Sequence, residues 1–191
     1  MADSRIELIV MVSSFGGLDA SATVLAHLQP RQIPAIILLT HLSDDSGTTY
    51  AEVLAHKTGH AITIARDKSP IRPGHVYLAP GGYHLLIEDD KTFALSEDGK
   101  VHNVRPSADV LFESLAHIYR DKVIAVVLTG ANDDGAAGLA SIYNLGGRCI
   151  IQSPETAVAR SMPLAAIKQC ENCLVVSLDQ IAEKIQDSLT H

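Results

Sequence analysis

Hydroxyl, imidazole and carboxylate side chains follow three of the apolar segments of this chain. Ser13 and Ser14 follow "IELIVMV", His41 follows "AIILLT", and Asp133 and Asp134 come a few residues after "VIAVVLT". A serine hydroxyl attacks an acyl carbon efficiently when a histidine removes its proton and a carboxylate orients that histidine. These residues are therefore candidates for a nucleophilic serine site, although their types alone do not say which serine or which aspartate takes part.

Each of these residues also has an ordinary structural explanation. Ser14 could be the N-cap of a following helix, His41 a loop histidine, and Asp134 the cap of the next helix. The glycines of "SSFGG" and "TGANDDGAAG" could instead bind a phosphate at helix N-termini. Neither loop matches the dinucleotide-binding or P-loop motif, and neither contains a lysine. The coincidence of three suitable groups at three segment ends favours the catalytic interpretation.

The elements that must position these residues alternate between apolar strands and helices. Near-continuous apolar segments predict strands covered on both faces, as in a parallel sheet. The expected strands are 6–12, 35–40, 61–65, 123–129, 148–152 and 173–177. Helices are expected over 18–28, about 47–58, within "RPSADVLFESLAHIYR", over about 135–145, after Pro163 and from Leu178. Short strand-like pieces split by "PGG" and "EDDK" predict a small antiparallel β-hairpin. In such an α/β sheet, sites gather at the carboxyl ends of the strands, where the candidate residues fall.

The composition is that of a folded globular protein. Hydrophobic residues make up 47% and charged residues 19% of the 191 residues, which suits one α/β domain over 1–191. A formal net charge of −7 argues against nucleic acid as a partner. No apolar run reaches the length of a membrane span, and the first residues do not form a secretory signal. Three cysteines are too few for a disulfide framework and fit a reducing cytoplasm.

Three further residues have types that suit a functional site. His84 follows the glycine pair of "APGGYHLLI", so we expect it to project over a site. Cys170 and Cys173 have the spacing of a redox motif, but no second pair completes a zinc site, and we assign them no function. The histidines lack ligand spacing, so we expect neither a metal nor a cofactor.

Several ordered blocks resemble the catalytic domain of the chemotaxis protein-glutamate methylesterases (the CheB-type methylesterases) over nearly the whole chain. The blocks are "SSFGG", "THL", "LAPGGYHL", "RPSADVLFESLA", "LTGANDDGAAGL" and "TAVARSMPLAAI". The resemblance implies a doubly wound, Rossmann-like three-layer α/β domain with a Ser-His-Asp triad. It also implies hydrolysis of glutamyl methyl esters, and deamidation of glutamine, on the cytoplasmic helices of methyl-accepting chemotaxis receptors. The implied protein is a cytoplasmic signalling enzyme that needs no cofactor and does not insert into the membrane.

Carried over by position, the resemblance gives individual residues a role. Ser14 is the nucleophile, because one residue separates it from the glycine pair, and His41 is the base. Asp134 stands directly before "GAAG" and is the orienting acid. The backbone N–H groups around Phe15 and Ala131 are the expected oxyanion donors.

The chain departs from the family pattern close to these residues. Val12 and Phe15 replace a glycine and a threonine, Asp44 and Asp45 follow the histidine in place of a proline-rich turn, and "TTYAEVLAHKTG" lacks the family's usual arginine. Two added acids and a lost arginine disfavour docking on an acidic helix. We also expect no receiver domain within this chain. A binding or regulatory module that keeps the triad, and an esterase for an unrelated small ester, therefore stay open as alternatives.

Overall fold

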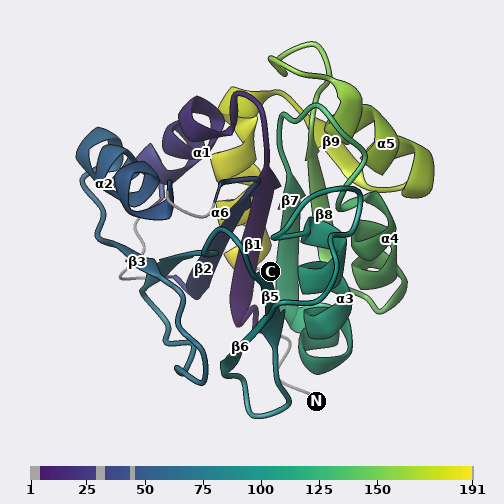
Figure 1. Cartoon of the computed structure of the whole chain (residues 1–191). Helices are drawn as coiled ribbons and strands as arrows, with labels where there is room; N and C mark the ends of the chain where they lie inside the picture. The colour runs from purple at the N-terminus through teal and green to yellow at the C-terminus, as the bar shows by residue number, and fades with distance from the viewer. Residues whose placement is uncertain (1–4, 29–32, 44–45, 191) are drawn as a thin grey trace.

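Seven parallel strands form the main sheet of the computed structural model, which describes residues 5–28, 33–43 and 46–190 (Figure 1). The strands are β1 (Leu8–Ser13), β2 (Ala35–Thr40), β3 (Ile62–Ile64), β4 (Val76–Leu78), β7 (Val123–Val127), β8 (Arg148–Gln152) and β9 (Leu174–Val176). Their order is β3-β4-β2-β1-β7-β8-β9, and every neighbouring pair is parallel. From β1 the chain first forms β2, β3 and β4 on one side of it and then β7, β8 and β9 on the other, so the topological switch point lies at β1. Ligands of such sheets bind beyond the carboxyl ends of the strands at this point.

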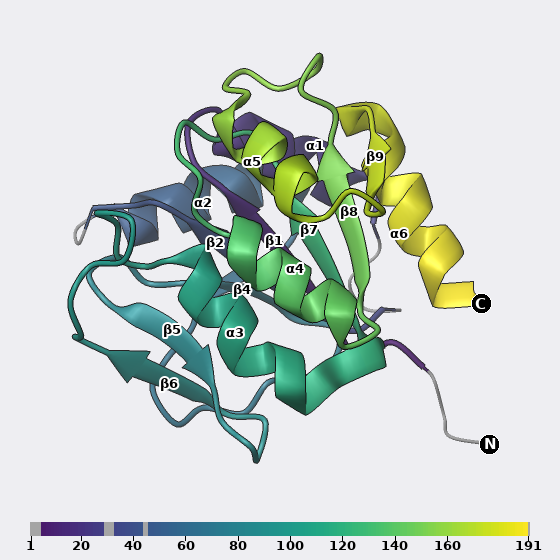
Figure 2. The ribbon, with the colours of Figure 1, turned by 90° about the vertical axis from the view of Figure 1, so that its right-hand side faces the viewer.

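Helices cover both faces of the sheet, as a doubly wound fold requires (Figures 1 and 2). One face carries α1 (Gly17–Ala26), α2 (Gly47–Thr58) and α6 (Ile181–Thr190), and the other carries α3 (Ala108–Tyr119), α4 (Ala136–Asn144) and α5 (Ser161–Gln169). Short 3₁₀ turns occupy Arg120–Lys122 and Leu178–Gln180. The expected α/β class with a mainly parallel sheet is confirmed.

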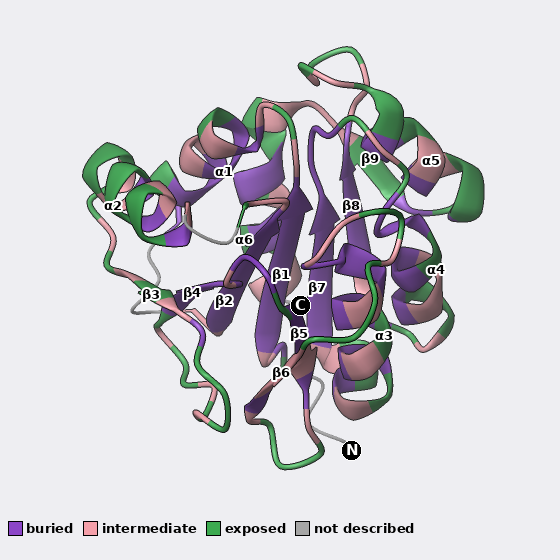
Figure 3. Cartoon of the chain, in the orientation of Figure 1, coloured by how far each residue is buried: buried purple, intermediate pink, exposed green. Residues whose placement is uncertain are grey.

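Alternation along β1 explains how one strand serves two cores. Side chains of a strand point to opposite faces in turn, so Val10 and Val12 pack with Phe112 of α3, whereas Met11 packs with Val24 of α1. All six residues of β1 are buried, and Figure 3 shows the central strands buried along their length while the helices expose their outer sides. A strand covered on both faces must be apolar throughout, which accounts for the uninterrupted "LIVMV".

The expected β-hairpin is present and packs on α3. It consists of β5 (His84–Ile87) and β6 (Phe93–Ser96), which pair antiparallel with His84 opposite Ser96. The hydroxyl of Ser114 in α3 accepts a hydrogen bond from the backbone N–H of Ile87 (3.0 Å). The preceding segment "VYL" is not part of the hairpin: it forms β4 and lies between β3 and β2 in the main sheet.

Two details differ from the expectations at the C-terminal side of the chain. The helix expected after Pro163 begins at Ser161, because proline is tolerated in the first turn of a helix, where no intrahelical acceptor faces its nitrogen. Cys170 and Cys173 form a disulfide bond just after α5, and Cys149 is free and buried. The sequence predicted only that three cysteines form no disulfide framework, so this single bond was not expected. Within the described residues, no helix combines the length and apolarity needed to cross a bilayer.

Candidate active site

Ser14 and His41 follow paired positions of two adjacent strands. The last pair in the register of β1 and β2 is Ser13 opposite Thr40. Ser14 and His41 are the residues that directly follow this pair. On the other side of β1, the backbone N–H of Ser14 donates to the carbonyl of Thr129, just beyond β7 (2.9 Å). The carboxyl ends of β2, β1 and β7 thus meet at Ser14, at the switch point of the sheet.

His41 is held by a buried carboxylate. Its Nε2–H donates to Oδ2 of Asp134 at 2.7 Å, and the side chains of the two residues are 9% and 0% exposed. The amide of Asn132 lies 3.1 Å from Nδ1 on the other side of the ring and donates to it. Both contacts select the tautomer with the proton on Nε2, which leaves the lone pair of Nδ1 as the basic position.

Asp134 is held in place by hydrogen bonds from the first residues of α3 and the residue before it. Its Oδ1 accepts hydrogen bonds from the hydroxyl of Ser107 (2.6 Å) and the backbone N–H of Asp109 (3.1 Å), and its Oδ2 accepts one from the N–H of Ala108 (2.6 Å). Burial alone would raise the pKa of this carboxyl, but the hydrogen bonds from His41, Ser107 and the two N–H groups outweigh it and lower the pKa. The side chain is therefore a carboxylate at neutral pH.

Asp134 caps a helix, but not the one that follows it in sequence. The N-terminal N–H groups of a helix lack partners within the helix and attract negative charge. Asp134 supplies an acceptor and a negative charge to the start of α3, 26 residues before it in sequence. The helix that follows Asp134 in sequence is α4, which begins two residues after it. The capping and catalytic interpretations are therefore compatible, because one carboxylate bonds to the helix and to His41 at the same time.

The two serines have different environments although they are neighbours. Ser13 is 2% exposed, and it hydrogen-bonds with the hydroxyl of Tyr50, whose pKa is raised by burial. Ser14 is half-buried and lies beyond the last residue of the strand. Among the hydrogen bonds of the described residues, none joins the hydroxyl of Ser14 to His41, whose Nδ1 faces Asn132. Of the two hydroxyls, only that of Ser14 is open to a substrate.

The backbone around Ser14 presents donors to the same edge. Within the described part of the chain, the N–H groups of Phe15 and Ala131 have no hydrogen-bond acceptor. Phe15 precedes Gly16, whose φ of 80° turns the chain into α1, and an L-residue is strained in this conformation. The hydroxyl of Thr129 donates to the carbonyl of Phe15 (2.9 Å) and so ties this turn to the end of β7. These donors lie close to the N-terminus of α1, where a developing negative charge is stabilised.

Close packing leaves no room for a side chain beside Ser14. A Cβ on Gly130 would collide with Met162 of α5 and would lie 3.1 Å from the Cβ of Ser14. The N–H of Met162 donates to the carbonyl of Gly130 (3.0 Å), which fixes the distance between them. Glycine at this position therefore lets α5 support the serine loop.

His84 does not project over the site, so the expectation for this residue is wrong. It is 1% exposed, its Nδ1 accepts the N–H of Ser107 (3.2 Å), and its Nε2–H donates to the carbonyl of Gly99 (3.0 Å). The ring lies behind the start of α3 and joins two loops. A glycine pair before a residue does not decide whether the next side chain points to solvent or to the core.

One group of side chains has the composition of a metal site. Ligand atoms of His102, Asp109 and Asp134 lie within 4.8 Å of one another. However, each oxygen of Asp134 already accepts two hydrogen bonds, and Asp109 bonds to the N–H of Gly138 (2.7 Å) and to His102 (3.0 Å). These oxygens are already occupied by hydrogen-bond donors, which leaves no free ligand atom for a cation, so the residues do not fit a metal.

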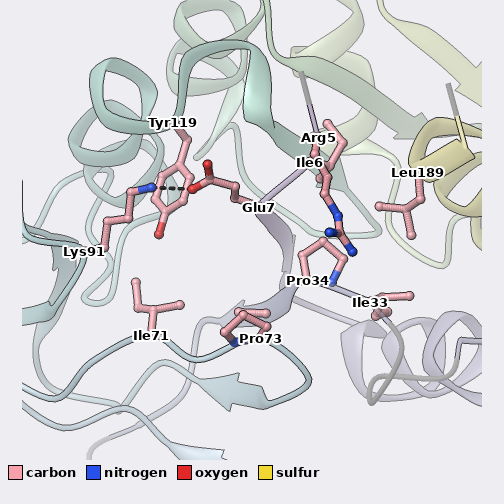
Figure 4. A pocket seen from close by; sticks show the side chains of 11 residues that line it. Arg5, Ile6, Glu7, Ile33, Pro34, Ile71, Pro73, Lys91, Tyr119 and Leu189 are labelled. Carbon is pink, nitrogen blue, oxygen red and sulfur yellow. Dashed lines mark hydrogen bonds and ion pairs between the residues drawn. The ribbon is translucent and has the colours of Figure 1, made fainter. Parts of the chain in front are cut away.

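A hollow of about 560 Å³ lies at the opposite end of the central strands, where β1 and β2 begin (Figure 4). Its lining includes Glu7 and Ala35, which stand at the starts of β1 and β2, together with Lys91 and Tyr119. Glu7 is already paired with two lysines, Lys91 and Lys122. The hollow is thus separated from Ser14 by the length of the central strands, and two of its charged residues, Glu7 and Lys91, are paired with each other.

Sequence reasoning missed two residues that bond directly to the histidine–aspartate pair. Ser107 lies in the segment "RPSADVLFESLAHIYR", where the sequence predicts only a helix, and its hydroxyl donates to Asp134. Asn132 stands two residues before Asp134, and its amide faces His41. Its position in a loop at the strand end was the only signal available, and it did not separate Asn132 from its polar neighbours.

The fold and this edge define a class of protein: a doubly wound α/β protein with a serine next to a buried histidine–carboxylate pair, as in serine hydrolases. Comparisons with known proteins agree with this class. A family model described as CheB methylesterase matches residues 9–185. The crystal structure of the Thermotoga maritima CheB methylesterase catalytic domain is similar with a TM-score of 0.90 and 30% sequence identity, over 95% of this chain and 98% of that one.

Curated proteins from other bacteria are also similar. A "Putative protein-glutamate methylesterase/protein-glutamine glutaminase" of Leptospira interrogans is 42% identical over 177 residues, which are 93% of this chain and 92% of that protein. A "Protein-glutamate methylesterase/protein-glutamine glutaminase 1" of Xanthomonas euvesicatoria is 36% identical over 181 residues, which cover 93% of this chain and 50% of that protein. The chain belongs to the CheB methylesterase family, a family of carboxylic ester hydrolases.

Proposed function

We propose that this protein hydrolyses glutamyl methyl esters of a protein substrate with Ser14 as nucleophile, His41 as base and Asp134 as orienting acid. The observation that carries the proposal is the buried hydrogen bond between His41 and Asp134 at the strand ends next to Ser14. The names of the similar proteins supply the substrate class. An isolated histidine–aspartate pair is common in proteins, but its place at the switch point beside an accessible serine suits acyl chemistry.

The reaction proceeds through an acyl-enzyme. The Oγ of Ser14 attacks the ester carbonyl carbon while Nδ1 of His41 takes the hydroxyl proton. The carbonyl oxygen becomes an oxyanion and accepts hydrogen bonds from the N–H groups of Phe15 and Ala131. The C–O bond to the methoxy group then breaks, and His41 returns the proton so that methanol leaves. A water molecule repeats the sequence with His41 as base and releases the glutamate side chain and the free serine.

Asp134 and Asn132 have separate parts in this scheme. The carboxylate of Asp134 keeps the proton of His41 on Nε2 and stabilises the imidazolium that forms. The amide of Asn132 occupies Nδ1 in the free protein. When Nδ1 binds the serine proton it can no longer accept a hydrogen bond from Asn132, so this amide must turn away in the reacting complex.

The proposed receptor substrate and place of action rest on the resemblance to the chemotaxis methylesterases. The glutamyl esters would lie on the cytoplasmic helices of chemoreceptors, and the protein would act in the cytoplasm. The names of the similar proteins also include glutamine deamidation. The same acyl-enzyme forms from a glutamine side chain, with ammonia in place of methanol as the leaving group. Asp44 and Asp45, which we expected to disfavour an acidic partner, lie outside the described residues.

Phe15 gives this site an apolar side chain next to the nucleophile. Its side chain is 66% exposed, so it borders the site from the solvent side and does not fill it. Its backbone N–H is independent of the side chain, and a phenylalanine can therefore donate to the oxyanion as a threonine would. Phe15 can contact apolar side chains of a protein substrate around the ester.

Methanol release from a receptor-derived peptide with a glutamyl methyl ester tests the proposal. The wild-type protein should release one methanol per ester, and Ser14→Ala should lower the rate by several orders of magnitude because the nucleophile is lost. Ser13→Ala is the matched control, since its hydroxyl faces Tyr50, and it should retain most of the activity. Equal rates for Ser14→Ala and wild type would contradict the proposal. Binding of the peptide without methanol release would support a binding module instead.

A further inference from the structure

The loop 97–105 reaches the candidate active site from the side of the β-hairpin. It contains a tight turn in which Val101 and Val104 exchange both backbone hydrogen bonds (3.2 and 2.9 Å). The two central residues, His102 and Asn103, have φ angles of 51° and 61°. Two successive positive φ values at the centre of a turn are typical of type I′, the turn that matches the twist of a hairpin. The turn therefore fixes the direction of the residues on either side of it.

Side chains of three residues fix the loop: His102 and His84 tie it to the rest of the protein, and Arg105 closes it on itself. His102 lies between Asp109 (3.0 Å) and Asp133 (3.2 Å), one carboxylate at each ring nitrogen. The buried ring of His84 donates to the carbonyl of Gly99 (3.0 Å). Arg105 donates through Nη1 to the carbonyls of two preceding residues of the loop (2.7 and 3.0 Å). A loop with this many anchors presents its side chains in a defined position.

The loop and His41 enclose a hollow of about 610 Å³. Lys100, Asn103 and Arg105 line it together with His41, and its remaining lining residues are uncharged. Among the described residues, the lining of the hollow thus combines two cationic side chains with no carboxylate, in a chain whose formal net charge is −7. Asp44 and Asp45, which follow Ser43 in sequence, lie outside the described residues. Within the described part of the chain, no ion pair involves Lys100. The Nε of Arg105 is buried and has no hydrogen-bond acceptor among these residues.

We propose that this hollow binds carboxylate side chains next to the ester-bearing residue, so that Lys100 and Arg105 select substrates whose reacting glutamyl ester is flanked by acidic residues. The inference rests on the proposed esterase function and adds a specificity site to it. His41 lines the hollow, so the hollow begins at the proposed base and lies within reach of residues that flank an ester bound at Ser14. Among the described residues, Lys100 has no ion pair and Arg105 bonds only to carbonyls. Carboxylates are the groups that such cationic side chains bind.

The expected selectivity is modest and sensitive to salt. An exposed pair of opposite charges contributes little, and reversing one charge replaces attraction by repulsion. We therefore expect Lys100→Glu to weaken binding of an acidic peptide about three- to tenfold. Lys100→Gln removes the charge only and should have a smaller effect. Salt near 0.5 M should abolish most of the difference, because charges at this exposure are screened.

The test compares two peptides that carry the same glutamyl methyl ester, one with flanking glutamates and one with glutamines at those positions. Dissociation constants are measured on Ser14→Ala protein, with and without Lys100→Glu. Lys168→Glu is the matched control, since it makes the same charge change on the exposed side of α5. The preference for the acidic peptide should fall about three- to tenfold with Lys100→Glu and stay constant with Lys168→Glu.

Equal loss of preference in the two lysine variants would overturn the inference, since the effect would then come from net charge alone. Equal binding of the two peptides by the protein with Lys100 intact would overturn it as well. Methanol release by wild-type protein is measured in parallel. If no methanol is released but the preference depends on Lys100, the proposed esterase function fails while the carboxylate-binding hollow stands.

Discussion

Replacing Asp134 by asparagine should impair both catalysis and stability, because four donors converge on this carboxylate. One pair, from His41 and Ala108, bonds to Oδ2, and the other pair, from Ser107 and Asp109, bonds to Oδ1. Asparagine offers one oxygen and one amino group, so in either orientation its amino group faces a pair of donors. At least one backbone N–H then loses its acceptor, whichever way the amide turns.

The size of the two effects follows from this geometry. A hydrogen bond to a charged group contributes about 1.5–3 kcal/mol, so the loss of one or two bonds should destabilise the protein by about 2–4 kcal/mol. For a domain of this size, such a loss lowers Tm by roughly 5–15 °C. If the amino group faces His41, the ring must take the tautomer with the proton on Nδ1 and cannot accept the serine proton. The corresponding change in a well-studied serine protease lowers kcat by about 10⁴.

The contribution of the Asp134 carboxylate to stability should depend on pH. Because hydrogen bonds lower the pKa of Asp134 in the folded protein, its stabilising effect is complete above the ordinary aspartate pKa of about 3.9. It disappears as the pH falls through the lowered pKa. The difference in the free energy of unfolding between wild type and Asp134→Asn should therefore be large at pH 7 and shrink below about pH 4.

Steady-state methanol release and thermal or urea unfolding measure the two effects. Asp133→Asn is the control, because the side chain of Asp133 is 69% exposed and, among the described residues, pairs with His102 alone. It should keep activity within a few fold of wild type. Activity of Asp134→Asn within tenfold of wild type, or a larger loss in Asp133→Asn, would refute the assignment. An unchanged Tm would refute the argument from the four donors.

Three further predictions concern the base, the packing beside the nucleophile and the cysteines. His41→Gln should lower kcat by several orders of magnitude, because the base that accepts the serine proton is lost, and activity within tenfold of wild type would contradict this. Gly130→Ala should lower activity at least tenfold, because its Cβ collides with Met162, whereas Gly47→Ala, whose nearest contact is at 3.9 Å, should not. Alkylation of denatured protein followed by mass spectrometry should modify Cys149 alone without reductant and all three cysteines with it.

Periodic patterns predicted the main elements because burial on both faces of a parallel sheet leaves a direct trace in the sequence. The strand at 35–40 agrees with β2 residue for residue, and the polar residues after the strands do meet at one edge. The segment of β4 has only three buried residues, and a strand so short cannot be assigned to one sheet or another from its pattern.

Contacts between distant segments could not be predicted in the same way. The carboxylate of Asp134 caps α3 from a position 26 residues further along the chain. The preference of serine for N-cap positions would instead suggest that Ser107 caps this helix with its own hydroxyl. The burial of His84 depends on its bonds to Gly99 and Ser107, which come from two different loops. Likewise, the spacing of two cysteines does not say whether the chain turns back between them.

The most direct test of the account is the site of the acyl intermediate. The protein is mixed with a slowly deacylating chromogenic ester, quenched with acid, digested and mapped by mass spectrometry. The account predicts a burst of one chromogenic alcohol per protein and an acyl group on Ser14, with neither burst nor adduct in Ser14→Ala. An adduct on Ser13 or on any other residue, or turnover that persists in Ser14→Ala, would contradict the claim that Ser14 is the nucleophile of this esterase.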